Sequence, residues 1–148
     1  MKHIIPFIFL SVLGACRVVE EDSSVPESRV YFKTTYDEYV KLGNSGTFLT
    51  FKPGEGIYAT NTYLGYGGLI VFRDFEGKIH CCDLSCPVEA SRSTLVSVNA
   101  SLQAACPVCG SVFDLGWGLC TPVSGPAKET LKIYTHTVDN GTSIIVSN

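Results

Sequence analysis

The sequence predicts an all-β protein, built as an antiparallel β-sandwich or barrel. From residue 30 onward, short runs rich in Val, Ile, Tyr, Phe and Thr alternate with clusters of Gly, Pro, Asn and Asp. This alternation is typical of short strands joined by turns. Only residues 35–42 have the spacing of a helix. The runs that we expect to form strands are 47–51, 56–60, 68–72, 78–83, 93–98, 102–105, 111–114, 131–138 and 142–146.

Two of the expected connections are hairpin turns. Asp139-Asn140-Gly141 separates the last two runs, and Asn-Gly tolerates the positive φ angles that a type I′ turn requires. Residues 74–77 close a second hairpin in the middle of the chain. Hairpins of this kind join neighbouring antiparallel strands, as expected for a sandwich.

Length and composition limit the classes of function. The chain has 148 residues, of which 45% are hydrophobic and 17% are charged. This length fits one domain of roughly 100–150 residues. The formal net charge is −3 and the 11 basic residues are scattered singly. A nucleic-acid-binding protein needs a basic stripe to displace phosphate counterions, so we expect no nucleic-acid partner.

The N-terminus is typical of an exported protein. A short basic start precedes an apolar stretch, residues 4–13, that is too short to cross a bilayer as a helix. The stretch ends in Leu13-Gly14-Ala15-Cys16, which resembles a bacterial lipobox. We therefore expect residues 1–15 to be a lipoprotein signal peptide and Cys16 to carry the lipid. An ordinary secretory signal is the alternative.

The lipid would place the protein in the bacterial cell envelope, on the periplasmic or the surface side of the outer membrane, with the membrane as a partner. Residues 16–29 are acidic and contain a proline, so they have the composition of a tether. The β domain is expected to comprise residues 30–148, with a loop-rich site subdomain at about 79–127.

Six of the seven cysteines lie in one span of 40 residues. Cys106-Pro107-Val108-Cys109-Gly110 is a knuckle that turns two thiolates to one side, and such knuckles hold Zn²⁺ or iron. Upstream, Cys82 and Cys86 form a second pair. Four thiolates from two loops would complete a tetrahedral metal site. In an oxidising compartment, six cysteines can instead form three disulfides.

Residues 65–134 resemble a Rieske-type iron–sulfur domain. A glycine-rich strand entry precedes a first loop, Cys86-Pro87-Val88-Glu89-Ala90, and a second loop that begins at Cys106. Gly125, Pro126 and Ala127 then correspond to the proline loop that covers the cluster in this family. The resemblance implies a Rieske-like fold of the iron–sulfur protein type, with a small cluster-binding subdomain.

The ligand positions depart from the usual Rieske pattern. Cys86 and Cys106 occupy the two cysteine places of the family, whereas Val88 and Cys109 occupy the two histidine places. The chain is in this respect most similar to the Rieske-like lipoproteins of Bacteroidetes that lack the histidines. The resemblance implies a [2Fe–2S] cluster with cysteine ligands, whose potential should be low because imidazole ligands raise it. Such a cluster would transfer electrons to an unidentified protein partner.

The fourth ligand must come from Cys81, Cys82 or Cys120. Successive side chains of a strand point to opposite faces, so Cys81 and Cys82 cannot both face the site. We place Cys82 at the metal, with Cys86, Cys106 and Cys109, and treat Cys81 as a core thiol or as the disulfide partner of Cys120. His80 shares a face with Cys82 and is the other candidate ligand.

Three states of the cysteines remain open. The N-terminus lacks the arginine pair of a signal for folded export, so any metal would be acquired outside the cytoplasm. The alternatives are a variant [2Fe–2S] cluster, a structural Zn²⁺ or single iron, and a metal-free domain closed by disulfides. No base, cofactor loop or substrate pocket can be named, so the sequence favours an electron-transfer or binding module over an enzyme.

Overall fold

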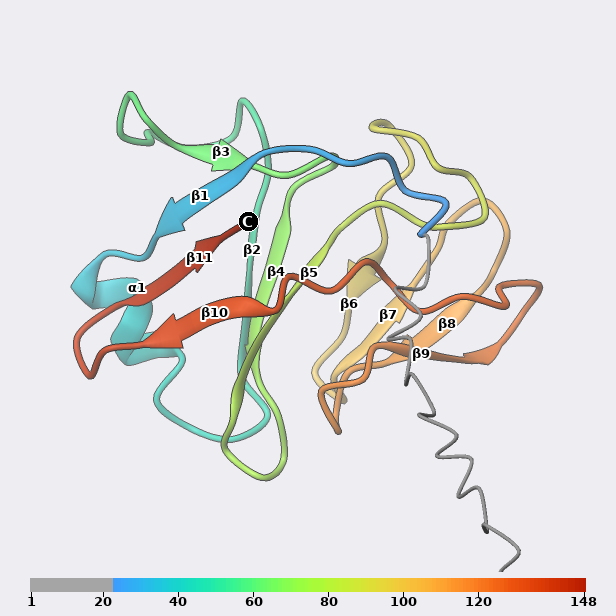
Figure 1. The fold of residues 1–148 in the computed structure, drawn as a ribbon. Helices are drawn as coiled ribbons and strands as arrows, with labels where there is room; N and C mark the ends of the chain where they lie inside the picture. Colours follow the sequence, from blue (N-terminus) through green and yellow to red (C-terminus); the bar gives the residue numbers. More distant parts are fainter. Residues whose placement is uncertain (1–22) are drawn as a thin grey trace, which may run out of the picture.

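A computed structural model describes residues 23–148; the expected signal peptide, Cys16 and the start of the tether lie outside the described residues. The described chain forms antiparallel strands in three sheets (Figure 1). The first sheet has the order β10(His136–Asp139), β11(Ile144–Ser147), β1(Val30–Lys33) and β3(Tyr63–Leu64). The second has the order β2(Phe48–Phe51), β4(Leu69–Arg73) and β5(Ile79–Asp83). The third has the order β6(Ser97–Val98), β7(Gln103–Ala105), β8(Val112–Asp114) and β9(Thr121–Ser124).

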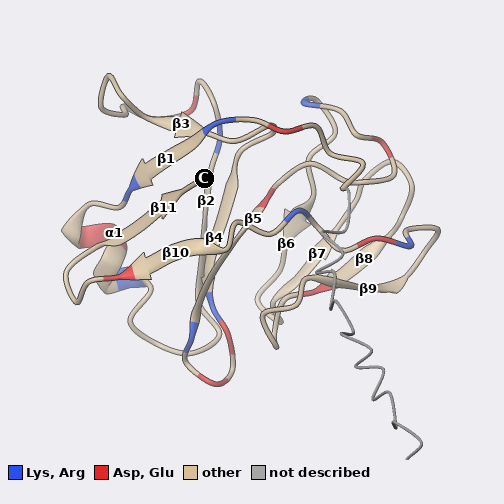
Figure 2. Ribbon diagram, viewed as in Figure 1, with Lys and Arg blue, Asp and Glu red and all other residues tan. Residues whose placement is uncertain are grey.

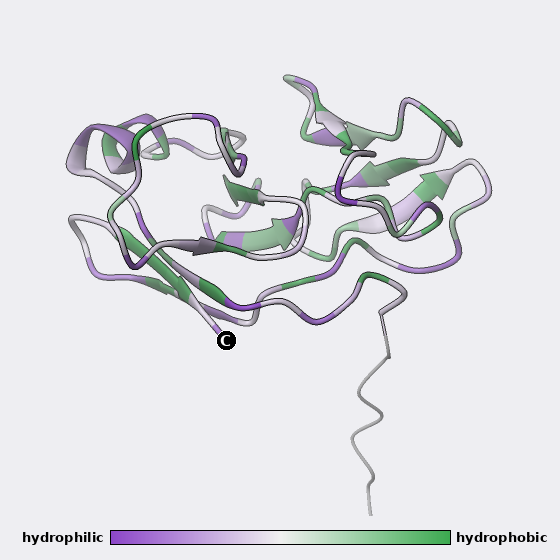
Figure 3. Cartoon of the chain, turned by 90° about the horizontal axis from the view of Figure 1, so that it is seen from above, coloured by the Kyte–Doolittle hydropathy of each residue, from purple (hydrophilic) through white to green (hydrophobic). Residues whose placement is uncertain are grey.

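The central strand of the middle sheet β2–β4–β5, which is β4, is buried on both faces. In β4, Ile70 and Phe72 belong to one hydrophobic core, whereas Leu69 and Val71 belong to a second. The first core lies against the β6–β9 sheet and the second against the sheet of β1 and β11. Figure 3 shows hydrophobic residues concentrated on the strands and hydrophilic ones on many of the connections. Burial of both faces explains why β4 is a continuous apolar run instead of an alternating one.

The all-β prediction is confirmed, and the sheets do not close into a barrel. The helix expected within 35–42 is present as α1(Tyr36–Lys41), which is closed at its N-terminus by a reciprocal capping box between Thr35 and Glu38. The expected strand 56–60 is absent, and this segment follows a turn in which Gly54 and Gly56 have φ angles of +82° and +92°.

Three strands were not expected: β1, β3 and β9. β1 exists because it pairs with β11 and β3 from distant parts of the chain, and a single sequence does not reveal such pairing. The expected strand 131–138 begins later than predicted, at His136. Its first half lies along β5 instead, where Tyr134 N donates to Cys81 O and Asp83 N donates to Lys132 O.

The later part of the expected tether, residues 16–29, is attached to the domain. Ser24 donates from both its amide and its hydroxyl to the Glu129 carboxylate, and Val25 is fully buried. Lys132 also bonds to the Val25 carbonyl and the Glu27 carboxylate. The chain is therefore attached to the domain from Ser24 onward, six residues before the expected domain boundary at residue 30.

Asp83 fixes the end of β5, from which the first cysteine loop departs. Its fully buried carboxylate accepts hydrogen bonds from the amides of Tyr66, Gly67 and Ser85 and from the Tyr134 hydroxyl, at 2.7–3.3 Å. Burial and the neighbouring carboxylate raise the pKa of Tyr134 far above its usual value, so its hydroxyl remains a donor. The network joins the loop after β3, the loop to Cys86 and the C-terminal segment.

Replacing Asp83 should strongly destabilise the domain. We expect Asp83→Asn to lower the free energy of unfolding by about 2–4 kcal/mol, because the amide group turns a donor toward buried donors. Tyr134→Phe, which removes only one donor, should cost about 1–2 kcal/mol. Urea denaturation measures both. The matched control is Asp114→Asn, whose half-buried carboxylate serves one amide; equal losses at positions 83 and 114 would contradict the role given to Asp83.

Candidate metal centre

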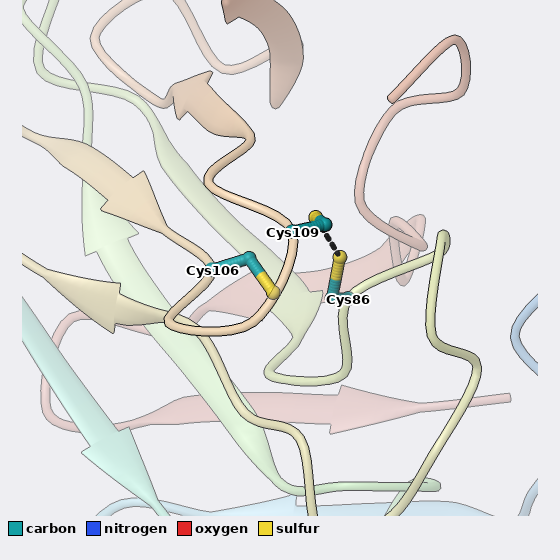
Figure 4. A group of neighbouring side chains, drawn as sticks. All are labelled: Cys86, Cys106 and Cys109. Carbon is teal, nitrogen blue, oxygen red and sulfur yellow. Dashed lines mark hydrogen bonds between the residues drawn. The ribbon is translucent and has the colours of Figure 1, made fainter. Parts of the chain in front are cut away.

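Three cysteine side chains meet where two loops face each other. The sulfur atoms of Cys86, Cys106 and Cys109 all lie within 4.8 Å of one another. Cys86 comes from the loop after β5, and the other two come from the turn between β7 and β8 (Figure 4). Cys86 and Cys106 are buried and Cys109 is partly exposed. The site is therefore accessible from the side of Cys109.

The first loop is held at both ends by backbone hydrogen bonds. Cys86 N donates to Thr94 O at 3.3 Å, and Ala90 N donates to Cys86 O at 2.8 Å, which closes one turn after the cysteine. A bridge between Ser85 and Leu95 pins the entry and exit of the loop together. The Cys86 side chain is therefore directed by backbone pairing and not by flexible contacts.

The second loop is a tight knuckle, as its sequence predicts. Cys106 N donates to Ser111 O at 2.8 Å, and Gly110 N donates to Cys106 O at 3.1 Å. Gly110 has a φ angle of +73°, a conformation that costs glycine little. This turn brings Cys106 and Cys109 to the same side of the loop, facing Cys86 (Figure 4).

The environments of two of the thiols differ. Burial raises the pKa of the Cys86 thiol to about 12, and backbone hydrogen bonds from Val88 and Glu89 offset only part of that effect. Burial also acts on Cys109, but hydrogen bonds from the Ser111 side chain and backbone and from the neighbouring thiols outweigh it and hold the pKa of Cys109 below its usual value. Cys109 is thus the more readily ionised of the two.

The loop expected to cover the site is packed against the knuckle. Ala127 N donates to Ser111 Oγ at 3.0 Å, and Ser111 Oγ lies 3.1 Å from Cys109 Sγ. Because its oxygen already accepts from Ala127, the Ser111 hydroxyl can donate its own hydrogen to a Cys109 thiolate. At Gly125, a Cβ would clash with the Ser111 backbone. Gly125 and Ala127 therefore lie against the knuckle through Ser111, and Ser111 is a residue beside the cluster that the sequence prediction did not include.

The three sulfurs have a spacing suited to a metal ion. Tetrahedral coordination at a Zn–S distance of about 2.3 Å separates two sulfurs by about 3.8 Å. Cys86 Sγ and Cys109 Sγ are 3.6 Å apart. Three thiols at this spacing fit thiolate-preferring ions such as Zn²⁺ or iron.

The remaining domain cysteines do not join this cluster. Cys82 was expected to be the fourth ligand, but it lies in the core between the middle sheet and the β6–β9 sheet, in the same core as Cys120. Cys82 belongs to β5, whereas Cys86 lies in the loop after β5. The side chain of Cys82 therefore points into the core, and that of Cys86 points toward Cys106 and Cys109. Cys81 faces the other core, as strand alternation predicts.

The expected disulfide between Cys81 and Cys120 is absent, because all six cysteines of the described residues are free thiols. Cys81 and Cys120 lie in opposite cores. Burial holds the pKa of Cys81 and of Cys82 well above the usual value. These thiols are therefore chemically inert in the folded protein.

Two further candidate positions do not supply ligands. His80 Nε2 lies 2.7 Å from Asp74 Oδ2, and its ring stacks on Phe72; it is a structural side chain of the hairpin around β4 and β5. Val88, in a histidine place of the Rieske pattern, is 45% exposed at the tip of the first loop. A hollow of about 240 Å³ lies at this loop, and its lining includes Pro87, Val88, Pro126, Ser24 and Glu129.

Comparison with protein families, with curated proteins and with solved structures finds no match for this chain. Across residues 23–148, none of the helices has the length and apolar character that crossing a membrane requires. Functional inference therefore depends on the geometry of the cysteine cluster.

The reactivity of each thiol should follow its burial and its pKa. In the native, metal-free protein, iodoacetamide should modify Cys109 first, because it is partly exposed and has the lowered pKa. Cys81, Cys82 and Cys120 should react only after unfolding in denaturant. Peptide mass spectrometry at several time points measures the order; early labelling of Cys120, or its recovery in a disulfide with Cys81, would contradict this arrangement.

Proposed function

We propose that the chain is a lipid-anchored protein of the bacterial cell envelope whose β domain holds one metal ion through the thiolates of Cys86, Cys106 and Cys109. The observation that carries this proposal is the convergence of three sulfurs, from two rigid loops, within 4.8 Å. Zn²⁺ and a single iron ion are both suited to such a ligand set. The lipobox at Cys16 supplies the anchor.

The fourth coordination position would be open. Within residues 23–148, no fourth Cys, His, Asp or Glu places a ligand atom in the cluster. Structural zinc sites are closed by four protein ligands, whereas three protein ligands leave a position for water or an added ligand. The partial exposure of Cys109 gives solvent a route to that position. The domain thus serves as a binding module with an accessible metal.

A second candidate is electron transfer by a variant [2Fe–2S] cluster, in keeping with the Rieske resemblance. The specific observation in its favour is the contact of the Gly125–Pro126–Ala127 loop with the knuckle through Ser111. Such a cluster would need a fourth ligand from outside the group of Cys86, Cys106 and Cys109, since Cys82 is buried in the core. The geometry therefore favours the single ion.

The metal and sulfide content of the purified protein distinguishes a single metal ion from a [2Fe–2S] cluster. The full chain, purified anaerobically without chelator, should contain one zinc or iron per protein and no acid-labile sulfide. Cys106→Ser should lose the metal on desalting, whereas Cys82→Ala should keep it, because Cys82 lies outside the cluster. Two irons and two sulfides per chain would support electron transfer instead. Absence of metal, with Cys86 disulfide-bonded to Cys106 or Cys109, would refute both metal sites.

The hydroxyl of Ser111 should strengthen metal binding. Outer hydrogen bonds to metal ligands typically change affinity by about 10–100-fold. We expect Ser111→Ala to weaken Zn²⁺ binding by about tenfold, because a hydrogen bond that stabilises the Cys109 thiolate is lost. Competition with a chromophoric chelator measures the affinity, and Ser101→Ala, at an exposed turn, is the control. Equal affinity of both variants would show that Ser111 does not act on Cys109.

A further inference from the structure

A groove with two arginines lies apart from the cysteine cluster. It has a volume of about 420 Å³, and its lining includes Arg29, Pro53, Tyr58, Tyr63 and Arg92. This volume is within the range of about 300–1,000 Å³ found for small-molecule sites. None of the described residues that line the groove is acidic. It is therefore a positively charged recess on a chain whose formal net charge is −3.

Both arginines are held in place on tyrosine rings. Arg29 Cζ lies 4.1 Å from the centroid of the Tyr63 ring, and Arg92 Cζ lies 4.4 Å from the centroid of the Tyr66 ring. Arg92 Nη1 also donates to the Tyr66 carbonyl at 3.0 Å. A stacked guanidinium is already ordered, so it loses little freedom when it binds a ligand.

Among residues 23–148, these guanidinium groups have no carboxylate partner. Of the three arginines in the described part of the chain, Arg73 pairs with Asp139, whereas Arg29 and Arg92 form no ion pair. Figure 2 shows Lys and Arg positions scattered along the ribbon among Asp and Glu positions. Both of these arginines nevertheless line the same groove. A guanidinium presents several N–H donors in a fork that matches carboxylate and phosphate.

The groove also offers surface for the carbon frame of a ligand. Tyr58 and Pro53 line it beside Tyr63, and the Tyr58 hydroxyl is held by the Lys52 carbonyl at 3.3 Å. A smaller hollow beside it shares Pro53 and Arg92 and is also lined by Lys52 and Glu55, which form an ion pair at 3.6 Å. The lining thus combines fixed cationic groups with aromatic and proline surface, as is typical of sites for organic anions.

We propose that this groove binds a small ligand, of about the size of a sugar, that carries a carboxylate or phosphate group recognised by Arg29 and Arg92. The site is independent of the cysteine cluster and of any metal there. A sugar acid and a sugar phosphate share this chemistry.

Titration calorimetry on the full chain in mild detergent tests the proposal with glucuronate, glucose 6-phosphate, inorganic phosphate and glucose. At least one of the two anionic sugars should bind saturably, and glucose should not. Tighter binding of glucuronate indicates a sugar acid, whereas tighter binding of glucose 6-phosphate, or of phosphate alone, indicates a phosphate ligand. Saturable binding of none of the anions, or equal binding of glucose, would overturn the proposal.

Variants connect the binding to the groove. Arg29→Gln and Arg92→Gln should each weaken binding of the anion by about tenfold or more, since a charge-assisted hydrogen bond is lost. Lys33→Gln, at an exposed position of β1, is the matched control and should leave affinity unchanged. Equal effects of all three substitutions would indicate general charge attraction and refute the site.

A measurement on the unsubstituted chain covers the case in which a variant fails to fold. Phenylglyoxal modifies accessible arginines, and the bound anion should protect Arg29 and Arg92 from it. Arg73, which is bonded to Asp139 and to backbone carbonyls, is the internal reference. Undiminished modification of Arg29 and Arg92 at saturating anion would overturn the proposal.

Discussion

The buried carboxylate of Asp83 is the interaction on which the arrangement of this domain depends. It satisfies three backbone amides and the Tyr134 hydroxyl at the point where β5 ends. An uncompensated buried charge is costly, so the segments that supply these donors must all be in place. Gly65 permits the approach, because a Cβ there would collide with Tyr134 and Asp83. Cys86 follows three residues later, and its position is thereby fixed.

Around this point the six domain cysteines divide into two chemical classes. Cys86, Cys106 and Cys109 belong to loops, where backbone turns bring their sulfurs together. Cys81, Cys82 and Cys120 are buried in the cores, and they behave as small apolar side chains. Cysteine thus acts as a candidate metal ligand in the loops and as a packing residue in the cores. The local backbone determines which of these two roles each cysteine has.

The attachment of residues 24–27 to the domain links the proposed anchor to the site. Ser24 is bonded to Glu129, in the segment that follows the loop over the knuckle. Ser24 lies eight positions after Cys16, and a fully extended chain of that length spans at most about 28 Å. With a lipid on Cys16, the proposed metal centre would therefore be held close to the membrane surface.

The sequence by itself determined the all-β class, the short helix and the knuckle of Cys106 and Cys109, because each depends on local spacing and turn chemistry. Strand alternation also separated Cys81 from Cys82. Only the tertiary structure decided that Cys82 lies in one core with Cys120, that Ser111 contacts Cys109 and that Arg29 and Arg92 share a groove. These contacts join segments far apart in the chain, and the packing of sheets that creates them has no local signature in a single sequence.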